Sequence, residues 1–119
     1  MRIIYQIGIK LLKLYFEVAV ICGNQKAIQS NIGRKKWRDD LSKLNKKKIT
    51  YWIHASSHGE GLMAIPLIEK FLESKDLQIV ITFFSPSGFK NFKYSNKSLF
   101  KTYLPIDSNK NMKNLVELI

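Results

Sequence analysis

The sequence is poor in cysteine: Cys22 is the only one among its 119 residues. A single cysteine cannot close an internal disulfide or supply a cysteine-based metal cluster, which excludes a disulfide-stapled secreted protein. We expect Cys22 to be a small buried or lipid-facing residue in a reducing compartment. With 45% hydrophobic and 24% charged residues the chain should fold, and its length suits one small domain.

Acidic residues are also few, because 9 Asp and Glu stand against 20 Lys and Arg, a net charge of +11. Such a charge favours anionic partners, namely nucleic acid, anionic lipid or phosphorylated small molecules. Arginine is scarce as well, with 3 residues against 17 lysines. A lysine-rich skew of this kind is also typical of a coding bias, so charge alone does not choose among these partners.

The most hydrophobic stretch covers residues 3–22. Its polar interruptions, Gln6, Lys10, Lys13 and Glu17, are spaced by four, three and four residues and therefore share one helical face. Charges near the bilayer centre cost roughly 2.5–3.5 kcal/mol each, which disfavours clean spanning. We expect residues 1–23 to form an amphipathic anchor helix in the membrane interface. A spanning anchor and an ordinary buried helix remain open as alternatives.

Residues 24–48 carry a run of basic side chains and are expected to form a basic connector. Arg34, Lys35, Lys36 and Trp37 have the composition of a membrane-interface segment, with the indole at headgroup level and the cations on lipid phosphate. A solvated, lysine-rich connector helix is the alternative.

From residue 49 onward the pattern alternates between strand and helix. Strands are expected at 49–53, 77–84 and 98–105, and helices at 59–74, 89–96 and from Asp107 or Ser108 to Leu118. Pro66 should bend or loosen the first of these helices. The order predicts the α/β class, a partial Rossmann-like parallel sheet. Three strands leave much edge uncovered, so we expect residues 49–119 to be an incomplete domain.

Ligands of open parallel sheets bind beyond the carboxyl ends of the strands. Three loops, 54–61, 82–88 and 103–107, follow the expected strands, and the first two are rich in hydroxyl groups and glycine. Glu60 is the single carboxylate of those two loops. A carboxylate beside a sugar hydroxyl can serve as a general base.

Five segments in this order and spacing resemble the N-terminal part of the 3-deoxy-D-manno-octulosonic acid (Kdo) transferases. They follow a hydrophobic N-terminal helix and cover essentially the whole chain. They are Gly33-Arg34-Lys35-Lys36-Trp37, His54-Ala55-Ser56-Ser57-His58-Gly59-Glu60, Ala64-Ile65-Pro66-Leu67-Ile68, Thr82-Phe83-Phe84-Ser85-Pro86-Ser87-Gly88 and Tyr103-Leu104-Pro105-Ile106-Asp107.

The resemblance implies an inverting glycosyltransferase of the GT-B fold that needs no metal or other cofactor. It would work at the cytoplasmic face of the inner membrane of a Gram-negative-type bacterium. Its donor would be CMP-Kdo and its acceptor the lipid A precursor (lipid IVA), a tetraacylated disaccharide bisphosphate. Membership would make the inner-membrane lipid surface and this precursor the partners, with no nucleic acid expected.

By the same resemblance, Glu60 matches the catalytic base, and Gly59 would let the backbone turn so that this carboxylate faces the cleft. Ser57, Ser85, Ser87 and Gly88 would line the acceptor side. His58 departs from the family, which usually has an apolar or small residue there.

The family's donor-binding C-terminal domain is not among these 119 residues. We therefore expect the chain to be inactive alone and to be a fragment, a truncated product or one half of a split enzyme with a separate donor-binding partner.

The same loops do not match the sequence patterns of a zinc site, a serine hydrolase or a nucleotide-binding loop. His54, His58 and Glu60 lack the helical H-E-x-x-H spacing of a zinc site. Ser56 and Ser57 do not lie in a G-x-S-x-G elbow. Neither a dinucleotide fingerprint nor a phosphate-binding P-loop is present.

Two non-catalytic functions stay open. Several aromatic residues interleave with Lys90 and Lys93, as on a surface that stacks nucleic-acid bases. Burial of Phe83 and Phe84 in the core, with the lysines coating a helix, is the preferred interpretation of that pattern. A catalytically inactive membrane-bound remnant, or a basic module that binds anionic lipid, is the other alternative. The aromatic residues concerned are Phe83, Phe84, Phe89, Phe92 and Tyr94.

Overall fold

The computed structural model describes residues 2–119, with side chains from residue 3 onward. Its elements follow one another as α1 (Arg2–Ile21), α2 (Gln25–Lys35), α3 (Trp37–Leu41), β1 (Ile49–Ala55), α4 (His58–Leu72), β2 (Leu77–Phe83), α5 (Pro86–Asn91), β3 (Leu99–Tyr103) and α6 (Asn109–Leu118).

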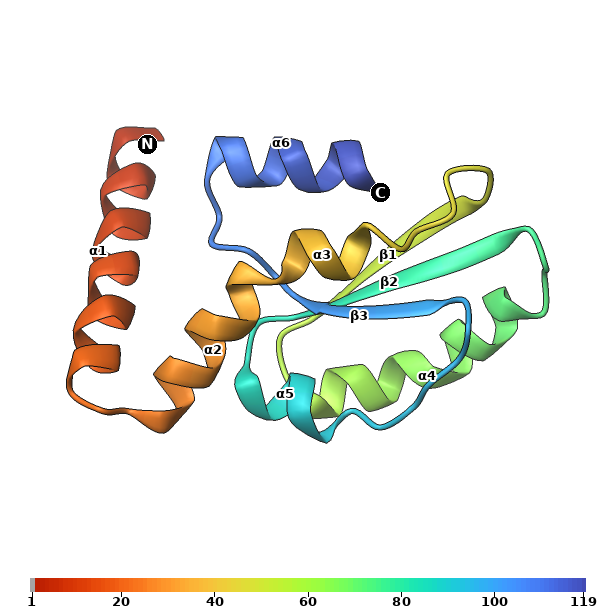
Figure 1. Cartoon of the computed structure of the whole chain (residues 1–119), viewed down its shortest axis with the longest axis horizontal. Coiled ribbons are helices and arrows are strands. Elements are labelled where there is room, and N and C mark those ends of the chain that lie inside the picture. Colours follow the sequence, from red (N-terminus) through yellow and green to blue (C-terminus); the bar gives the residue numbers. More distant parts are fainter. Residues whose placement is uncertain (1) are drawn as a thin grey trace.

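The three strands form one parallel sheet in the order β1-β2-β3. Ala55 of β1 pairs with Phe83 of β2, and Phe83 pairs in turn with Tyr103 of β3. The carboxyl ends of all three strands therefore lie at one edge of the sheet, next to α2 and α5 (Figure 1). This confirms the predicted α/β class and the Rossmann-like parallel sheet.

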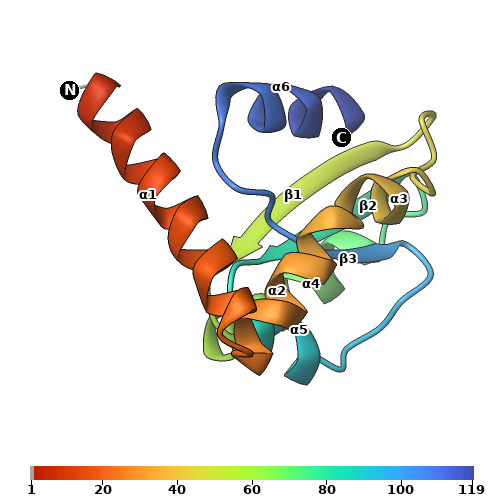
Figure 2. The ribbon, with the colours of Figure 1, turned by 60° about the vertical axis from the view of Figure 1, so that its left-hand side comes forward.

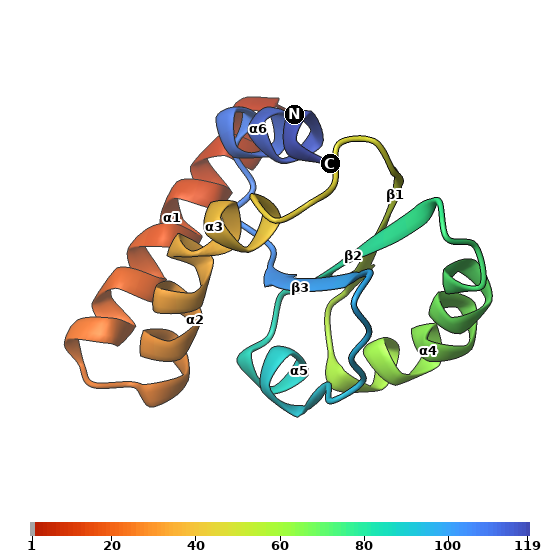
Figure 3. The ribbon, with the colours of Figure 1, turned by 45° about the vertical axis from the view of Figure 1, so that its right-hand side comes forward.

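Helices cover both faces of the sheet, which explains why β2 is apolar almost throughout. Alternate residues of β2 point to opposite faces, so Ile79, Ile81 and Phe83 pack with α4 and α5. Val80 points the other way and packs with Trp37 of α3 and the α6 helix. Figure 3 shows these two layers on either side of the strands.

Serine side chains begin three of the helices. Ser57, Ser85 and Ser108 each accept a hydrogen bond from the backbone N–H three residues later. The helix predicted at 89–96 is present but with the wrong bounds, because α5 begins at Pro86, directly after its serine cap, and ends at Asn91. Proline is favoured in the first helical turn, where its missing N–H has no acceptor to lose. The other strands and helices of 49–119 lie within two residues of the predicted bounds, and α4 continues through Pro66.

The two N-terminal helices form a hairpin. Gly23 ends α1 in the left-handed backbone region, with φ of 78°, and Asn24 caps α2. Figure 2 shows α1 as a rod that packs on α2 near its carboxyl end and extends away from the sheet at its amino end. Cys22 lies at this turn and is exposed, so the predicted buried position is wrong, and the lipid-facing position stays a prediction.

Residues 24–48 do not form a solvated connector. A stripe of buried side chains, spaced alternately by three and four residues, runs along α2, α3 and the following turn and packs them on the sheet. Trp37 is only 2% exposed and lies in the core with Val80. The prediction of Trp37 as a headgroup-level anchor is therefore wrong in this structure. The stripe consists of Ala27, Ser30, Arg34, Trp37, Leu41 and Leu44.

The α1 helix has two apolar faces. Ile9, Leu12 and Phe16 are partly covered on the side toward the domain. Another set of large apolar side chains, three or four residues apart along the helix, is at least half exposed on a different face. No helix among residues 2–119 is long and apolar enough to cross a membrane. The exposed set comprises Ile3, Ile4, Ile7, Leu11, Leu14, Tyr15, Val18 and Ile21; we call it the α1 strip.

Candidate active site and its cavity

The two serine-rich loops meet at the carboxyl edge of the sheet. The backbone N–H of Ser85 donates to the carbonyl of Ser56 at 3.2 Å, and Phe84 N–H donates to the carbonyl of Ala55 at 3.4 Å. These bonds continue the β1–β2 pairing beyond the strands. As a result, the loop after β1 and the loop after β2 form one surface rather than two separate turns.

Glycine allows this close approach at residue 88. A Cβ on Gly88 would lie 2.8 Å from the ring of Phe83, 2.9 Å from Ser85 Oγ and 3.1 Å from the carbonyl carbon of Ser57. Contacts this short require the neighbouring atoms to shift. Gly88 is thus the position at which α5 packs against the loop after β1.

Gly59 has no comparable role. It lies within the first turn of α4, and a Cβ there would meet nothing within 4 Å. The prediction that Gly59 provides a special backbone turn is wrong, because an ordinary helical residue fits this place. The direction of the Glu60 side chain is set by hydrogen bonds instead.

Glu60 occupies the third position of α4 and is exposed. Its Oε2 accepts a hydrogen bond of 2.7 Å from the backbone N–H of Ser56, while its own N–H donates to Ser57 Oγ at 3.4 Å. Oε1 has no hydrogen-bond partner among the described residues. One carboxylate oxygen is therefore held by the loop, and the other is free to accept a proton from a ligand.

Three serine hydroxyls lie on this surface with Glu60. Ser85 Oγ accepts from Gly88 N–H at 3.0 Å and from Ser87 Oγ at 3.4 Å, and Ser57 caps α4. Ser57 and Ser87 are exposed, and Ser85 is half-buried. The site residues predicted from the two loops, Ser57, Glu60, Ser85, Ser87 and Gly88, are thus brought together by the fold.

Among the described residues, neither histidine side chain is hydrogen-bonded to Glu60 or to the loop serines. His54 Nδ1 is 3.0 Å from Thr82 Oγ1, which also accepts a 2.9 Å bond from Trp52 Nε1. His58 begins α4. Within residues 2–119, no three His, Cys, Asp or Glu side chains are grouped as metal ligands.

Arg34 is buried at the same edge of the sheet, with only 7% of its surface exposed. Its Nε donates to the carbonyl of Leu104 at 3.1 Å, Nη2 to the carbonyl of Phe84 at 2.7 Å, and Nη1 to Ser30 Oγ. Arg34 therefore ties α2 to the ends of β2 and β3. Burial lowers the pKa of its guanidinium, and burial likewise raises the pKa of the neighbouring Tyr103 phenol.

Phe84 differs from its predicted core position. It is 38% exposed, and its ring lies against the guanidinium of Arg34, 4.7 Å from centroid to Cζ. Phe83 is fully buried as predicted, and Phe92 is 1% exposed. Because both of these rings are in the core, they are not available to stack on nucleic-acid bases.

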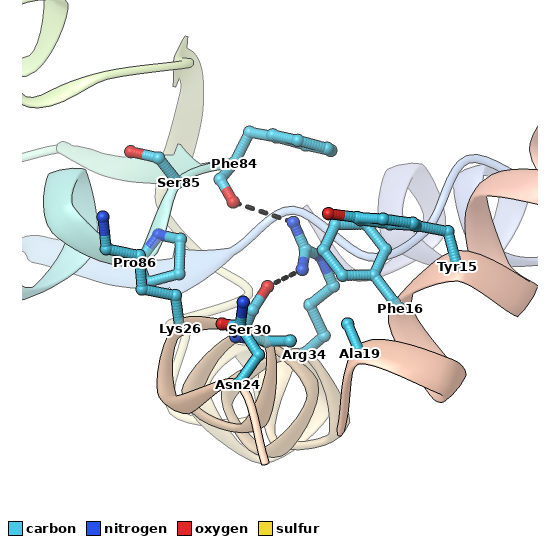
Figure 4. Close-up of a pocket in the computed structure, with 11 residues that line it drawn as sticks. Tyr15, Phe16, Ala19, Asn24, Lys26, Ser30, Arg34, Phe84, Ser85 and Pro86 are labelled. Carbon is cyan, nitrogen blue, oxygen red and sulfur yellow. Dashed lines mark hydrogen bonds between the residues drawn. The ribbon is translucent and has the colours of Figure 1, made fainter. Parts of the chain in front are cut away.

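A cavity of about 270 Å³ opens beside Arg34, between the carboxyl half of α1, the α2 helix and the start of α5. Figure 4 shows the guanidinium at its centre, bonded to Phe84 and Ser30, with Tyr15 and Phe16 of α1 beside it. Ser85 borders both this cavity and the loop surface that carries Glu60. The lining residues are Tyr15, Phe16, Ala19, Asn24, Lys26, Ala27, Ser30, Arg34, Phe84, Ser85 and Pro86.

Comparison with known proteins decides the family. A sequence profile of the 3-deoxy-D-manno-octulosonic-acid transferases (kdotransferases) matches residues 29–119. The chain belongs to the Kdo transferase family. A bifunctional glycosyltransferase/methyltransferase of Fusobacterium nucleatum is 33% identical over 88 residues, which cover 71% of this chain and 14% of that protein. No solved structure matches the chain significantly.

The chain is accordingly a glycosyltransferase domain by its membership of this family. The matched region begins within α2 and includes every residue of the Glu60 surface. It also includes Arg34, Lys35, Lys36 and Trp37, of which only the two lysines are exposed.

Some features of the candidate site are not predicted by the sequence. The cavity residues Lys26 and Ser30 were not singled out, and Arg34 was expected to face a membrane. The signal was present in the alternating spacing of the buried stripe along residues 27–44, in which Ser30 and Arg34 are four residues apart on one helical face.

Proposed function

We propose that this chain is the acceptor-binding part of an enzyme that transfers Kdo from CMP-Kdo to the lipid A precursor (lipid IVA). The observation that carries the proposal is the Glu60 carboxylate. It lies at the carboxyl edge of the sheet, where ligands of such folds bind, with Oε2 held by Ser56 N–H and Oε1 free. Transfer of Kdo is the activity after which the chain's family is named.

In the proposed reaction, Glu60 acts as the general base. An acceptor sugar hydroxyl gives its proton to the carboxylate as its oxygen forms a bond to the anomeric carbon of Kdo. The bond from that carbon to the phosphate oxygen breaks at the same time, and CMP leaves with the electron pair. Attack opposite the leaving group inverts the configuration. The step balances without a metal or a cofactor.

The serine-rich loop surface would contact the acceptor sugar around the attacking hydroxyl. Ser57 and Ser87 are exposed beside Glu60, while Gly88 is buried and lets α5 pack closely against the loop that carries Ser57. Hydroxyl groups can donate to and accept from a sugar, and this suits an acceptor whose orientation must be fixed before proton transfer.

We propose that α1 lies in the interface of the inner membrane, on its cytoplasmic face. The α1 strip offers a continuous apolar surface, and Lys10 and Lys13 on the neighbouring polar face are exposed. A helix with this arrangement buries its apolar side among acyl chains while its cations meet lipid phosphates. Exposed Lys35 and Lys36 would add to the same attraction. An acceptor embedded in that membrane would then meet the enzyme without leaving the bilayer.

The chain spans 14% of the length of its Fusobacterium relative, so the activity of a whole protein goes beyond these residues. The family resemblance assigns CMP-Kdo binding to a second domain. We therefore propose that the 119 residues alone do not transfer Kdo, and that a donor-binding half, in the same polypeptide or a separate one, completes the enzyme.

The test is product formation in membranes that contain the native protein. Incubation with CMP-Kdo and lipid IVA should yield a glycolipid heavier by one or more Kdo residues, detected by mass spectrometry, and the isolated 119-residue chain should yield none. Native membranes that consume CMP-Kdo without forming this glycolipid would refute the acceptor, and membranes that leave CMP-Kdo intact would refute the reaction.

One observation favours a second candidate, an inactive membrane-bound module that binds anionic lipid. The hydrogen bonds of Glu60 to Ser56 and Ser57 are also those of a helix cap, which a protein without catalysis could retain for stability. In that case vesicle binding would persist in the native protein, and no Kdo product would form under any condition.

A further inference from the structure

Arg34 carries a buried charge without a carboxylate partner. The ion pairs of the described residues all join lysine to glutamate, in Lys13–Glu17, Lys70–Glu73 and Lys113–Glu117. Arg34 donates three of its five N–H groups to oxygen atoms of Leu104, Phe84 and Ser30, all of which are neutral. Buried charges in proteins are ordinarily paired, so an anion bound beside Arg34 would supply a partner of opposite charge.

The cavity beside Arg34 is lined by several hydrogen-bond donors. Lys26 adds a second cation, and no Asp or Glu occurs among the eleven described residues that line it. Ser30 Oγ and Ser85 Oγ already accept hydrogen bonds from Arg34 and Gly88, so each hydroxyl proton remains available. The Oδ1 of Asn24 accepts from Ala27 N–H, which leaves the two Nδ2 protons. A ligand that accepts many hydrogen bonds and carries negative charge fits this set.

The walls of the cavity also define the ligand. The rings of Phe16 and Phe84 lie against the guanidinium, with their centroids 5.1 Å and 4.7 Å from Arg34 Cζ, and Tyr15 lines the same cavity. Tyr15 belongs to the α1 strip, so apolar surface leads from the cavity to the proposed membrane side. Apolar walls around cations suit a phosphate that is attached to an organic group.

We propose that this cavity binds a phosphate ester, held by Arg34 and Lys26. Resting on the proposed function, the phosphate is one carried by the lipid acceptor. Ser85 joins the cavity to the loop bearing Glu60, so a phosphate held here places the attached sugar beside the catalytic carboxylate. A soluble phosphate ester has the same chemistry, and the experiment separates the two sources.

The experiment measures binding to the native protein in a nonionic detergent by titration calorimetry. The probes are dihexanoyl phosphatidic acid, inorganic phosphate and, as an uncharged-headgroup match, dihexanoyl phosphatidylcholine. Lys26→Glu reverses the exposed cation of the cavity at the start of α2, where a negative charge suits the helix. Lys75→Glu makes the same change in net charge in the α4–β2 turn, outside the cavity.

We expect saturable binding of the phosphatidic acid, weakened about tenfold or more by Lys26→Glu and less than about twofold by Lys75→Glu. Binding of inorganic phosphate with equal affinity would support the site but assign it to soluble phosphates. Absence of binding, equal losses in both variants, or equal binding of the phosphatidylcholine would each overturn the proposal.

The experiments distinguish a failure of the proposed phosphate-ester site from a failure of the proposed role of Glu60 as the base. If Kdo transfer by the native protein depends on Glu60 while no probe binds, the phosphate site is wrong and the enzyme stands. If the probes bind as expected while transfer is indifferent to Glu60, the site stands and the role of Glu60 is wrong.

Discussion

The backbone N–H of Ser56 donates a 2.7 Å hydrogen bond to Oε2 of Glu60, so the loop that leaves β1 holds the carboxylate at the start of α4. An amide oxygen at residue 60 can accept the same bond, because glutamine has the shape of glutamate without its charge. The substitution Glu60→Gln therefore separates the structural role of residue 60 as a hydrogen-bond acceptor from its proposed role as a base. The helix cap depends on an acceptor, and the proposed proton transfer depends on a base.

Gly88→Ala should destabilise the fold, because its Cβ would lie within 3.1 Å of Phe83, Ser85 and the backbone of Ser57. Overpacking of this kind costs about 1–3 kcal/mol in the free energy of unfolding. Urea denaturation of the two proteins measures the difference.

Gly59→Ala is the matched control, since its Cβ meets nothing within 4 Å and residue 59 is helical. Alanine is the better helix former, so this variant should be at least as stable as the wild type. Equal losses at residues 59 and 88 would contradict the close packing of the two loops.

Trp37→Ala tests the core position of the indole. Truncating a buried aromatic residue costs about 3–5 kcal/mol, so the thermal midpoint should fall steeply. Lys36→Ala, at the exposed neighbouring position, should stay within about 0.5 kcal/mol of the wild type. A stable Trp37→Ala protein that binds vesicles poorly would restore the headgroup interpretation.

The double variant Leu11→Glu, Leu14→Glu tests the α1 strip as a membrane surface. Both leucines are more than half exposed, and burying two such side chains in a bilayer is worth about 3 kcal/mol or more. Binding to phosphatidylcholine vesicles should therefore fall at least about a hundredfold in a flotation assay.

Its control, Lys10→Gln with Lys13→Gln, makes the same change in net charge on the polar face. Because these vesicles carry no net charge, the control should bind about as well as the wild type. Equal binding by the Leu11, Leu14 variant would show that the strip does not contact lipid.

Much of the fold was predictable from residues 49–119, where local patterns and tertiary packing agree. The apolar run at 77–84 predicted a strand buried on both faces, which the structure has at 77–83, and Ser57 and Ser108 stand where helices begin. Glu60 and the loop serines followed from the rule that parallel strands end at one edge.

The remaining features depend on contacts that local patterns do not reveal. Basic neighbours hid the core position of Trp37, although its spacing from Leu41 marks one helical face. Phe84 comes directly after a buried strand, and only the position of Arg34 on another element explains why its ring stays outside. The start of α5 at Pro86 could have been predicted from the sequence, because a serine followed by a proline is a common beginning of a helix.

The most direct test of the central claim compares Kdo transfer by the native protein with its Glu60→Gln and Glu69→Gln variants, at matched protein levels in membranes. Glu69 is exposed on the same helix and serves as the control. General-base catalysis contributes about 10²–10⁴-fold, so Glu60→Gln should lower kcat by at least about a hundredfold while the folded protein keeps its thermal stability. Glu69→Gln should transfer Kdo like the wild type. Undiminished transfer by Glu60→Gln would show that Glu60 is not the base.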